Sequence, residues 1–167
     1  AFTQIMPGGP YPGCFLVPKG GVLGWWITHR GIKTLARRAG QSVETIPYFD
    51  GDTLTINRGR DYGFDLIEGD ADRDSYEALH GVVVMVRDIA TGNVLSIRKV
   101  TGQAIDKRRA KAMSQDIWNA WPIEMAEKTA IKFAAARGDV FFDEVGNMAL
   151  SREAEIPRAP PAPSPLA

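Results

Sequence analysis

Cysteine and histidine are scarce in this chain of 167 residues, and their scarcity excludes several kinds of chemistry. Cys14 is the single cysteine, so no internal disulfide can form, which is typical of a reducing cytoplasm. With only His29 and His80 beside it, no Cys/His zinc cluster can be assembled. No G-x-S-x-G elbow supplies a nucleophile, and no G-x-x-x-x-G-K-[ST] loop is present. We therefore predict no catalytic residue, no metal ligand and no use of ATP.

No apolar run in the chain is long enough to cross a membrane. The longest runs, such as residues 81–86, fall far short of the roughly 20 residues that a membrane helix needs. A basic segment followed by an apolar one, as in a secretory leader, is not found at the start either. We therefore expect a soluble, cytoplasmic protein without a membrane partner. The sequence begins at Ala1 and enters a strand-like pattern almost at once, so we also expect that further residues precede it.

The formal net charge is zero, because 20 basic residues balance 20 acidic ones. The charges are nevertheless distributed unevenly along the chain. Residues 50–77 carry nine acids against three bases, whereas residues 98–137 carry nine bases against four acids. The chain is therefore dipolar, and its two charged regions suit different partners.

The acidic region permits a metal-binding interpretation. Asp61, Asp65, Asp70, Asp72 and Asp74 offer the carboxylate oxygens that Mg²⁺ prefers. The segment "DADRD" lacks the fixed glycine and the distal glutamate of a calcium loop. A solvated loop is the simpler interpretation, and a Mg²⁺-dependent nuclease is kept as an alternative.

Most of the first hundred residues read as short strands joined in hairpins. "CFLVP" and "VLGWWI" flank residues 19–21, and "HGVVVMVRD" and "NVLSIRKVTG" flank "IATGN". Between these hairpins, "VETIPYF", "TLTINRG" and "YGFDLIEG" form three further strand candidates. An Asp-Gly pair in residues 50–52 favours a tight turn that pairs the first two of them. The pattern predicts an antiparallel meander, in which the apolar strand at residues 80–88 is central.

Three segments have the period of a helix instead. Residues 28–40 place their apolar side chains on one face, with Thr28 as N-cap and Gly40 at the end. The other two segments are "AIDKRRAKAMSQDIW" and "PIEMAEKTAIKFAAAR", the second with Pro122 in its first turn and Gly138 just past its last.

These elements predict the domain organisation. We expect an α+β domain over residues 1–150, with an antiparallel sheet and helices packed on it. Residues 151–167 are rich in proline and alanine and contain little apolar bulk, so we expect a flexible tail there.

Basic residues recur at helical spacing in this domain. Arg30, Lys33 and Arg37 lie three and four residues apart, and Lys128 and Lys132 lie four apart. Cations at such intervals can neutralise successive phosphates of a nucleic-acid strand and release condensed counterions. Solvated faces of amphipathic helices would show the same spacing, so charge alone leaves both interpretations open.

The helix at residues 122–137 is unusually rich in alanine. Small side chains such as Ala126, Ala130 and Ala134 allow another backbone to approach closely, which would hold the two lysines at a groove. Of the four tryptophans we expect most in the core. Trp25 and Trp26 are adjacent and point to opposite faces of a strand, so one of them needs another cover, such as a neighbouring subunit.

Four blocks carry a resemblance to a known family. They are "CFLVPKGG", "HRGIKTLARRAGQ", "HGVVVMVRDIATGNV" and "WPIEMAEKTAIKFAA", and together they cover about residues 14–137. In type and order they resemble the strand block, the L-A-R-R helix, the central hairpin and the M-A-x-K-T helix of the RecT family of phage single-strand annealing proteins.

The resemblance implies a protein that is not an enzyme and needs no ATP. It would bind single-stranded DNA along the backbone and pair complementary strands into an annealed duplex during homologous recombination. It would act as a homo-oligomer, in a ring or helical filament, in the cytoplasm of a bacterial host. A phage exonuclease and a host single-strand-binding protein are further partners that the resemblance implies. No cofactor is implied, although Mg²⁺ could aid annealing by screening phosphate repulsion.

The resemblance also places DNA contacts on this sequence. By position, the first set that we predict is Lys128, Lys132, Arg37 and Arg38. The second set is Arg30, Lys33, Lys99, Lys107, Arg108 and Arg109. These cations are expected to line a basic groove between helix and sheet. Two alternatives stay open, namely the Mg²⁺-dependent nuclease and an assembly scaffold that does not bind DNA.

Overall fold

The computed structural model describes residues 13–19, 22–112 and 115–155. The strands in these ranges are β1 (Cys14–Lys19), β2 (Val22–Ile27), β3 (Gln41–Phe49), β4 (Thr53–Asn57), β5 (Gly63–Ile67), β6 (Leu79–Asp88) and β7 (Val94–Thr101). The helices are α1 (His29–Arg38), α2 (Gly102–Arg109), α3 (Gln115–Ala120), α4 (Pro122–Ala136) and α5 (Glu144–Glu155). The predicted α+β class is confirmed.

The centre of the fold is an antiparallel sheet of three strands in the order β3-β6-β7. In the middle strand, Val84 pairs with Thr45 on one side and with Arg98 on the other. Residues 82–86 of this strand are at most 3% exposed. A strand that is covered on both faces needs apolar side chains at every position, so the run "VVVMV" belongs in the middle of the sheet, as predicted.

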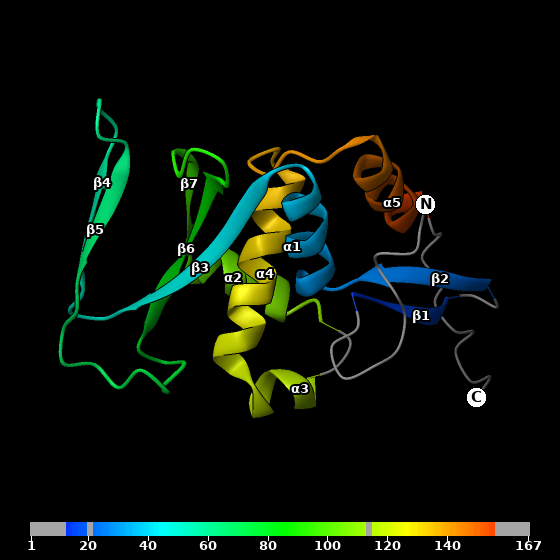
Figure 1. The fold of residues 1–167 in the computed structure, drawn as a ribbon. Helices are drawn as coiled ribbons and strands as arrows, with labels where there is room; N and C mark the ends of the chain where they lie inside the picture. Colours follow the sequence, from blue (N-terminus) through cyan, green and yellow to red (C-terminus); the bar gives the residue numbers. More distant parts are fainter. Residues whose placement is uncertain (1–12, 20–21, 113–114, 156–167) are drawn as a thin grey trace, which may run out of the picture.

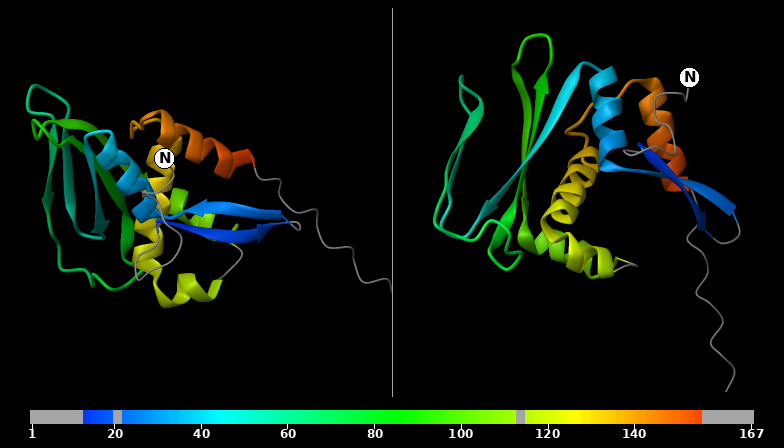
Figure 2. Two further views of the ribbon diagram at one scale, coloured as in Figure 1. Left: turned by 45° about the vertical axis from the view of Figure 1, so that its right-hand side comes forward. Right: turned by 60° about the horizontal axis from the view of Figure 1, so that its bottom comes forward.

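A different layer covers each face of this sheet (Figure 1). Helices α1, α2 and α4 lie on one face, and the β4–β5 hairpin lies along the other, as the right-hand view of Figure 2 also shows. Val82, Val84 and Val86 belong to the core beneath the helices. Val83 and Met85 alternate with them, point to the hairpin side and are 0% and 3% exposed.

The β4–β5 hairpin therefore forms a second, small sheet layer. Its half-buried face is made of the cross-strand pairs Leu54 with Leu66 and Ile56 with Phe64. Just before β5, the hydroxyl of Tyr62 accepts a hydrogen bond from the backbone N–H of Ile97 in β7, at 2.9 Å. This bond ties the end of the hairpin to the outer edge of the central sheet.

The predicted pairing of residues 43–49 with residues 53–59 is wrong, because β3 pairs with β6 and β4 pairs with β5. The turn at Gly51 is present, with φ of 82°. The carboxylate of Asp52 accepts the backbone N–H groups of Phe49 and Gly69, each at 2.7 Å. The turn therefore forms the base of the β4–β5 hairpin, where residues 49–52 meet the chain at Gly69. It does not connect two paired strands.

The predicted single helix over residues 104–118 is also wrong, because the segment forms α2 and α3. Lys111 lies beyond the end of α2 and does not extend a helical row from Lys107. The side-chain amide of Gln115 donates to the carbonyl of Arg109 at 2.9 Å, which supplies a partner at the end of α2. The break lets the ring of Trp118 enter the core, where it is 2% exposed.

At the other side of the helices, β1 and β2 form the predicted hairpin, and α5 contacts β2 (Figure 1). Residues 20–21, which we predicted in its turn, lie outside the described residues. Helix α5 was not predicted, and it reaches Glu155, inside the segment expected as a tail. Residues 156–167 lie outside the described residues. Among the helices that the structure describes, none combines the length and the apolar character needed to cross a bilayer.

Candidate nucleic-acid interface

The first turn of α1 is held firmly in place. As predicted, Thr28 is the N-cap, and its hydroxyl oxygen accepts the backbone N–H of Gly31 at 3.1 Å. The same hydroxyl donates to the carbonyl of Gly13 at 3.0 Å. The cap fixes the direction in which the next two side chains, His29 and Arg30, leave the helix.

Helix α4 brings two lysines to the same region. Its inner face carries Ala126, Ala130 and Ala134, which are each 0% exposed and let the helix lie close to the sheet, as predicted. Lys128 and Lys132 lie two residues from these alanines, so helical geometry directs them away from the sheet. Both are half-buried.

A tryptophan ring from β2 lies beneath both lysines. The Nζ atom of Lys132 is 4.9 Å from the centroid of the Trp26 ring, and that of Lys128 is 5.8 Å from it. The face of an indole ring attracts an ammonium group by roughly 0.5–1 kcal/mol at a partly exposed site. The ring therefore helps to hold both lysines over one surface.

The pKa of His29 shows that these charges converge. Burial, followed by the positive charges of Arg30, Lys33, Lys128 and Lys132, lowers this pKa from 6.5 to about 4. Burial is the largest cause, and the cations of both α1 and α4 add to it because they lie near the same imidazole ring. We call Arg30, Lys33, Lys128 and Lys132, together with His29 and Trp26, the basic cluster.

The basic cluster is suited to anions. Four cations that already oppose the protonation of a neighbour produce a strong positive potential, which an incoming phosphate would relieve. The neutral imidazole of His29 adds a hydrogen-bonding group, and Trp26 adds an aromatic surface. This combination of charge and aromatic ring is common in proteins that bind single-stranded nucleic acid without reading its sequence.

The remaining predicted contacts on α1 extend beyond this cluster. Arg37 is exposed and continues the stripe of Arg30 and Lys33 toward the end of the helix. Arg38 forms an ion pair with Asp143, with 3.0 Å between Nη2 and Oδ2. Arg37 is thus exposed on the stripe, whereas Arg38 links α1 to the residue before α5.

The structure does not bring the other four predicted contacts to the basic cluster. Arg108 lies over the ring of Phe133 at 4.4 Å, and Arg109 lies over that of Tyr76 at 4.6 Å. Lys107 is exposed on α2. Lys99 lies at the end of β7, over the ring of Tyr48 at 4.9 Å. The ten predicted cations therefore occupy several surfaces, and the basic cluster gathers four of them.

Two members of the basic cluster were missed as site residues. His29 directly precedes Arg30 in the sequence, but only the packing of α4 against α1 shows that its ring is surrounded by cations. Trp26 is half-buried, and it belongs to the adjacent pair of tryptophans of which one was expected to need another cover. Of the other tryptophans, Trp118 is buried at 2% exposed, whereas Trp121 is 62% exposed. The side chain of Trp25 lies outside what the structure describes.

The acidic region has a structural use. The side chain of Asp52 is 0% exposed and receives two hydrogen bonds of 2.7 Å from the guanidinium of Arg73, in the loop that follows β5. Among the described residues, no three His, Cys, Asp or Glu side chains come together in a way that could hold a metal ion. The geometry thus supplies no observation that favours the nuclease alternative.

No protein-family model matches this chain, and no curated protein matches it.

Proposed function

We propose that this protein binds single-stranded DNA through its sugar-phosphate backbone and anneals complementary strands without ATP. The observation that carries the proposal is the convergence of Arg30, Lys33, Lys128 and Lys132 around His29. The cations come from two helices, α1 and α4, and all four are among the contacts that the resemblance to single-strand annealing proteins implies. In this proposal the protein makes and breaks no covalent bond.

Annealing places a particular demand on the DNA-binding surface. The bases must remain free to pair, so the protein has to hold the phosphates and leave the base edges open. Lysine and arginine side chains on helices can do so, because they neutralise charge without recognising a base. The ring of Trp26 could support one base by stacking, which does not depend on sequence.

The wider setting of the proposal follows from the resemblance. The protein would act as a homo-oligomer in the cytoplasm of a bacterial host, on single strands and on the annealed duplex. A phage exonuclease and a host single-strand-binding protein would work beside it, and Mg²⁺ would aid annealing only by screening phosphates. We propose that Arg37, at the end of the α1 stripe, lengthens the DNA path beyond the basic cluster.

The first test is the salt dependence of DNA binding. We expect Lys132→Ala and Lys128→Ala to weaken the binding of a fluorescent oligonucleotide, measured by anisotropy. The slope of log affinity against log salt should fall by about 0.7 for each lost phosphate contact. Lys111→Ala removes the same charge from an exposed position outside the predicted set and is the matched control. Equal losses in all three variants would show that net charge, and not the basic cluster, determines binding.

The second test measures annealing itself. Two complementary fluorescent oligonucleotides should pair faster with the protein than without it, in the absence of ATP. A protein that assembles but gives no acceleration and no salt-sensitive binding would be the scaffold alternative. Shortened products of labelled DNA after incubation with Mg²⁺ would instead indicate the nuclease.

A further inference from the structure

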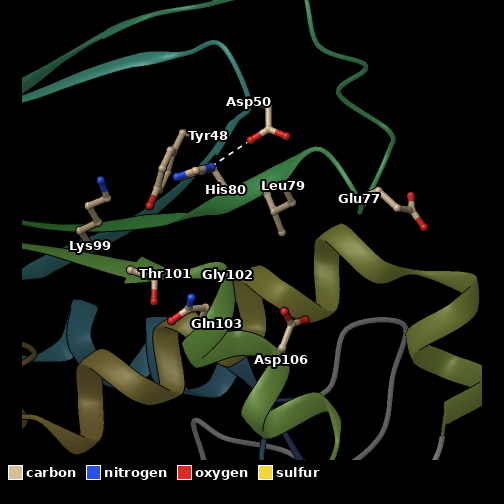
Figure 3. Close-up of a pocket in the computed structure, with 10 residues that line it drawn as sticks. All are labelled: Tyr48, Asp50, Glu77, Leu79, His80, Lys99, Thr101, Gly102, Gln103 and Asp106. Carbon is tan, nitrogen blue, oxygen red and sulfur yellow. Dashed lines mark hydrogen bonds and ion pairs between the residues drawn. The ribbon is translucent and has the colours of Figure 1, made fainter.

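A pocket of about 430 Å³ lies at the end of the central sheet (Figure 3), and none of its lining residues belongs to the basic cluster. It forms where β3 and β7 end, β6 begins and α2 starts. Its size falls within the range of pockets that take small molecules. Unlike most such pockets it is lined mainly by polar side chains, so charge and hydrogen bonding determine what it can hold.

The charge of the pocket is predominantly negative. Asp50, Glu77 and Asp106 contribute three carboxylates, against Lys99 and a histidine, His80. The lining carboxylates thus outnumber the one lining ammonium group, and the positive charge of Arg109, which acts on Glu77 from outside the lining, does not reverse the balance. The positive end of α2 adds only about half a charge. An anionic ligand is therefore disfavoured.

Each carboxylate is held by a separate neighbour. The Oδ1 atom of Asp50 lies 2.9 Å from Nδ1 of His80, and Asp106 accepts the hydroxyl of Tyr76 at 2.7 Å. Glu77 accepts its own backbone N–H and the hydroxyl of Ser75, and these bonds lower the pKa of its carboxyl group. Within the described residues the three acids form no group that could share one metal ion. They are negative charges distributed around a common space.

The hydroxyl of Tyr48 is a second, independent indication of a ligand. The residue is 2% exposed, and within the described residues this hydroxyl has no hydrogen-bond partner. In Figure 3 the oxygen points into the pocket, between Lys99 and Thr101. Gly81 makes room for the ring, because a Cβ atom there would lie only 2.5 Å from the hydroxyl oxygen. A buried hydroxyl without a partner is unfavourable, and a donor in the pocket would relieve it.

The ring of Tyr48 already accepts an ammonium group. The Nζ atom of Lys99 lies 4.9 Å from the ring centroid, in the position of a cation–π contact. Lys99 is exposed, so its flexible side chain can move aside without disturbing the core. The position over the ring is thus suited to an ammonium group and can be vacated.

We propose that this pocket binds a small organic cation with two or more ammonium groups, of the polyamine class. Separate ammonium groups would contact separate carboxylates, which a single metal ion could not reach together. One of them would replace Lys99 over Tyr48 and donate to the tyrosine hydroxyl. The proposal does not depend on DNA binding, because none of the groups that it uses belongs to the basic cluster.

Calorimetric titration of the full chain with spermidine, at about 0.15 M salt, tests the proposal. We expect one molecule bound per chain, and much weaker binding of butylamine, which has one ammonium group. Glu77→Gln should weaken spermidine binding about tenfold, the effect of losing one charge-assisted hydrogen bond. Asp61→Asn makes the same change in net charge on the exposed end of the β4–β5 hairpin, and should alter affinity less than twofold.

A second variant gives a change in the opposite direction. Lys99→Ala should tighten spermidine binding severalfold, because the competing ammonium group is removed from the Tyr48 ring. Absence of spermidine binding would overturn the proposal, because it would show that the pocket is not a binding site. Equal weakening by Glu77→Gln and Asp61→Asn would also overturn it, because it would show only diffuse attraction to acidic surface. Weaker binding by Lys99→Ala would also overturn it. Thermal unfolding of each variant verifies that it is folded.

Discussion

His29 experiences the positive charges of two helices at once. Its pKa in the folded protein is about 4, against 6.5 ordinarily, because of burial and the four surrounding cations. Between these two values the unfolded chain takes up a proton that the folded chain does not. The contribution of His29 to stability is therefore complete above pH 6.5 and is lost as the pH falls toward 4.

This linkage predicts the behaviour of a variant. His29→Gln cannot titrate, so its free energy of unfolding should decrease less than that of the wild type between pH 7 and pH 5. Urea unfolding at the two pH values measures the difference. An unchanged decrease in His29→Gln would contradict the placement of this ring among cations.

Asp52 is a second residue whose charge is fixed by its surroundings. The hydrogen bonds from Arg73, and then those from the N–H groups of Gly69 and Phe49, lower its pKa from 3.8 to about 2 despite burial. Stability that depends on this carboxylate is complete above pH 3.8 and is lost as the pH falls toward 2.

Asp52→Asn should therefore destabilise the protein at neutral pH. We expect a loss of about 2–3 kcal/mol, since the change removes the charge that pairs with Arg73 and one acceptor oxygen. Glu68 also approaches Arg73, at 3.9 Å, but its side chain is 73% exposed. Glu68→Gln should change the free energy of unfolding by less than about 0.5 kcal/mol. Equal effects in urea unfolding would show that Asp52 does not hold the base of the hairpin.

At the scale of elements, the start of α1 depends on a close approach between two backbone segments. A Cβ atom on Gly31 would lie 2.0 Å from the carbonyl oxygen of Gly13, so only glycine fits there. We expect Gly31→Ala to destabilise the protein by about 1–3 kcal/mol. Gly59→Ala meets nothing within 4 Å and should be neutral or slightly stabilising. Thermal unfolding compares the two, and a neutral Gly31→Ala would show that β1 and α1 can separate freely.

Local patterns predicted most of these elements. The hydrophobic period identified the strands and the helices α1 and α4, and Thr28 and Pro122 were placed correctly at helix starts. The alanines of α4 were expected to allow close packing and do so. Such features depend on neighbours within a few residues, which is the information that a sequence carries directly.

The errors have a common physical origin in distant contacts. Asp50-Gly51-Asp52 has the composition of a hairpin turn, but Asp52 bonds to Gly69 and Arg73, which follow much later in the sequence. The break between α2 and α3 contains no proline or glycine, and beyond it Trp118 is buried against distant elements of the core. The basic cluster likewise requires α1 and α4 to meet, so the sequence indicated its lysines and arginines but not His29.

At the scale of the whole molecule, two exposed acids of the β4–β5 hairpin lie in a different layer from the basic cluster. The β4–β5 hairpin carries Asp61 and Asp65 on the face of the sheet opposite the helices that bear the basic cluster (Figure 1). Exposed charges separated by more than about 10 Å are largely screened at 0.1 M salt. A molecule with no net charge can thus present a locally positive surface, as the proposed binding of DNA requires.

This separation predicts that position outweighs total charge. Asp61→Asn combined with Asp65→Asn raises the net charge by two, yet should change oligonucleotide affinity less than twofold at 0.15 M salt. Lys132→Ala lowers the net charge by only one and should weaken binding by about threefold or more, as the loss of a phosphate contact requires. Anisotropy titrations measure both. Affinity that followed net charge across these variants would argue against a localised DNA surface.

Pro47 in β3 and Tyr62 next to β5 together limit how copies of this protein can associate. A proline offers no N–H group, and on the opposite border the N–H of Ile97 is already bonded to the tyrosine hydroxyl. A strand arriving at either border of the central sheet would find its hydrogen bonding interrupted. Filaments or rings of this chain would therefore not be expected to grow by adding strands to the central sheet, so substitutions at its two borders should matter less to assembly than substitutions elsewhere on the surface.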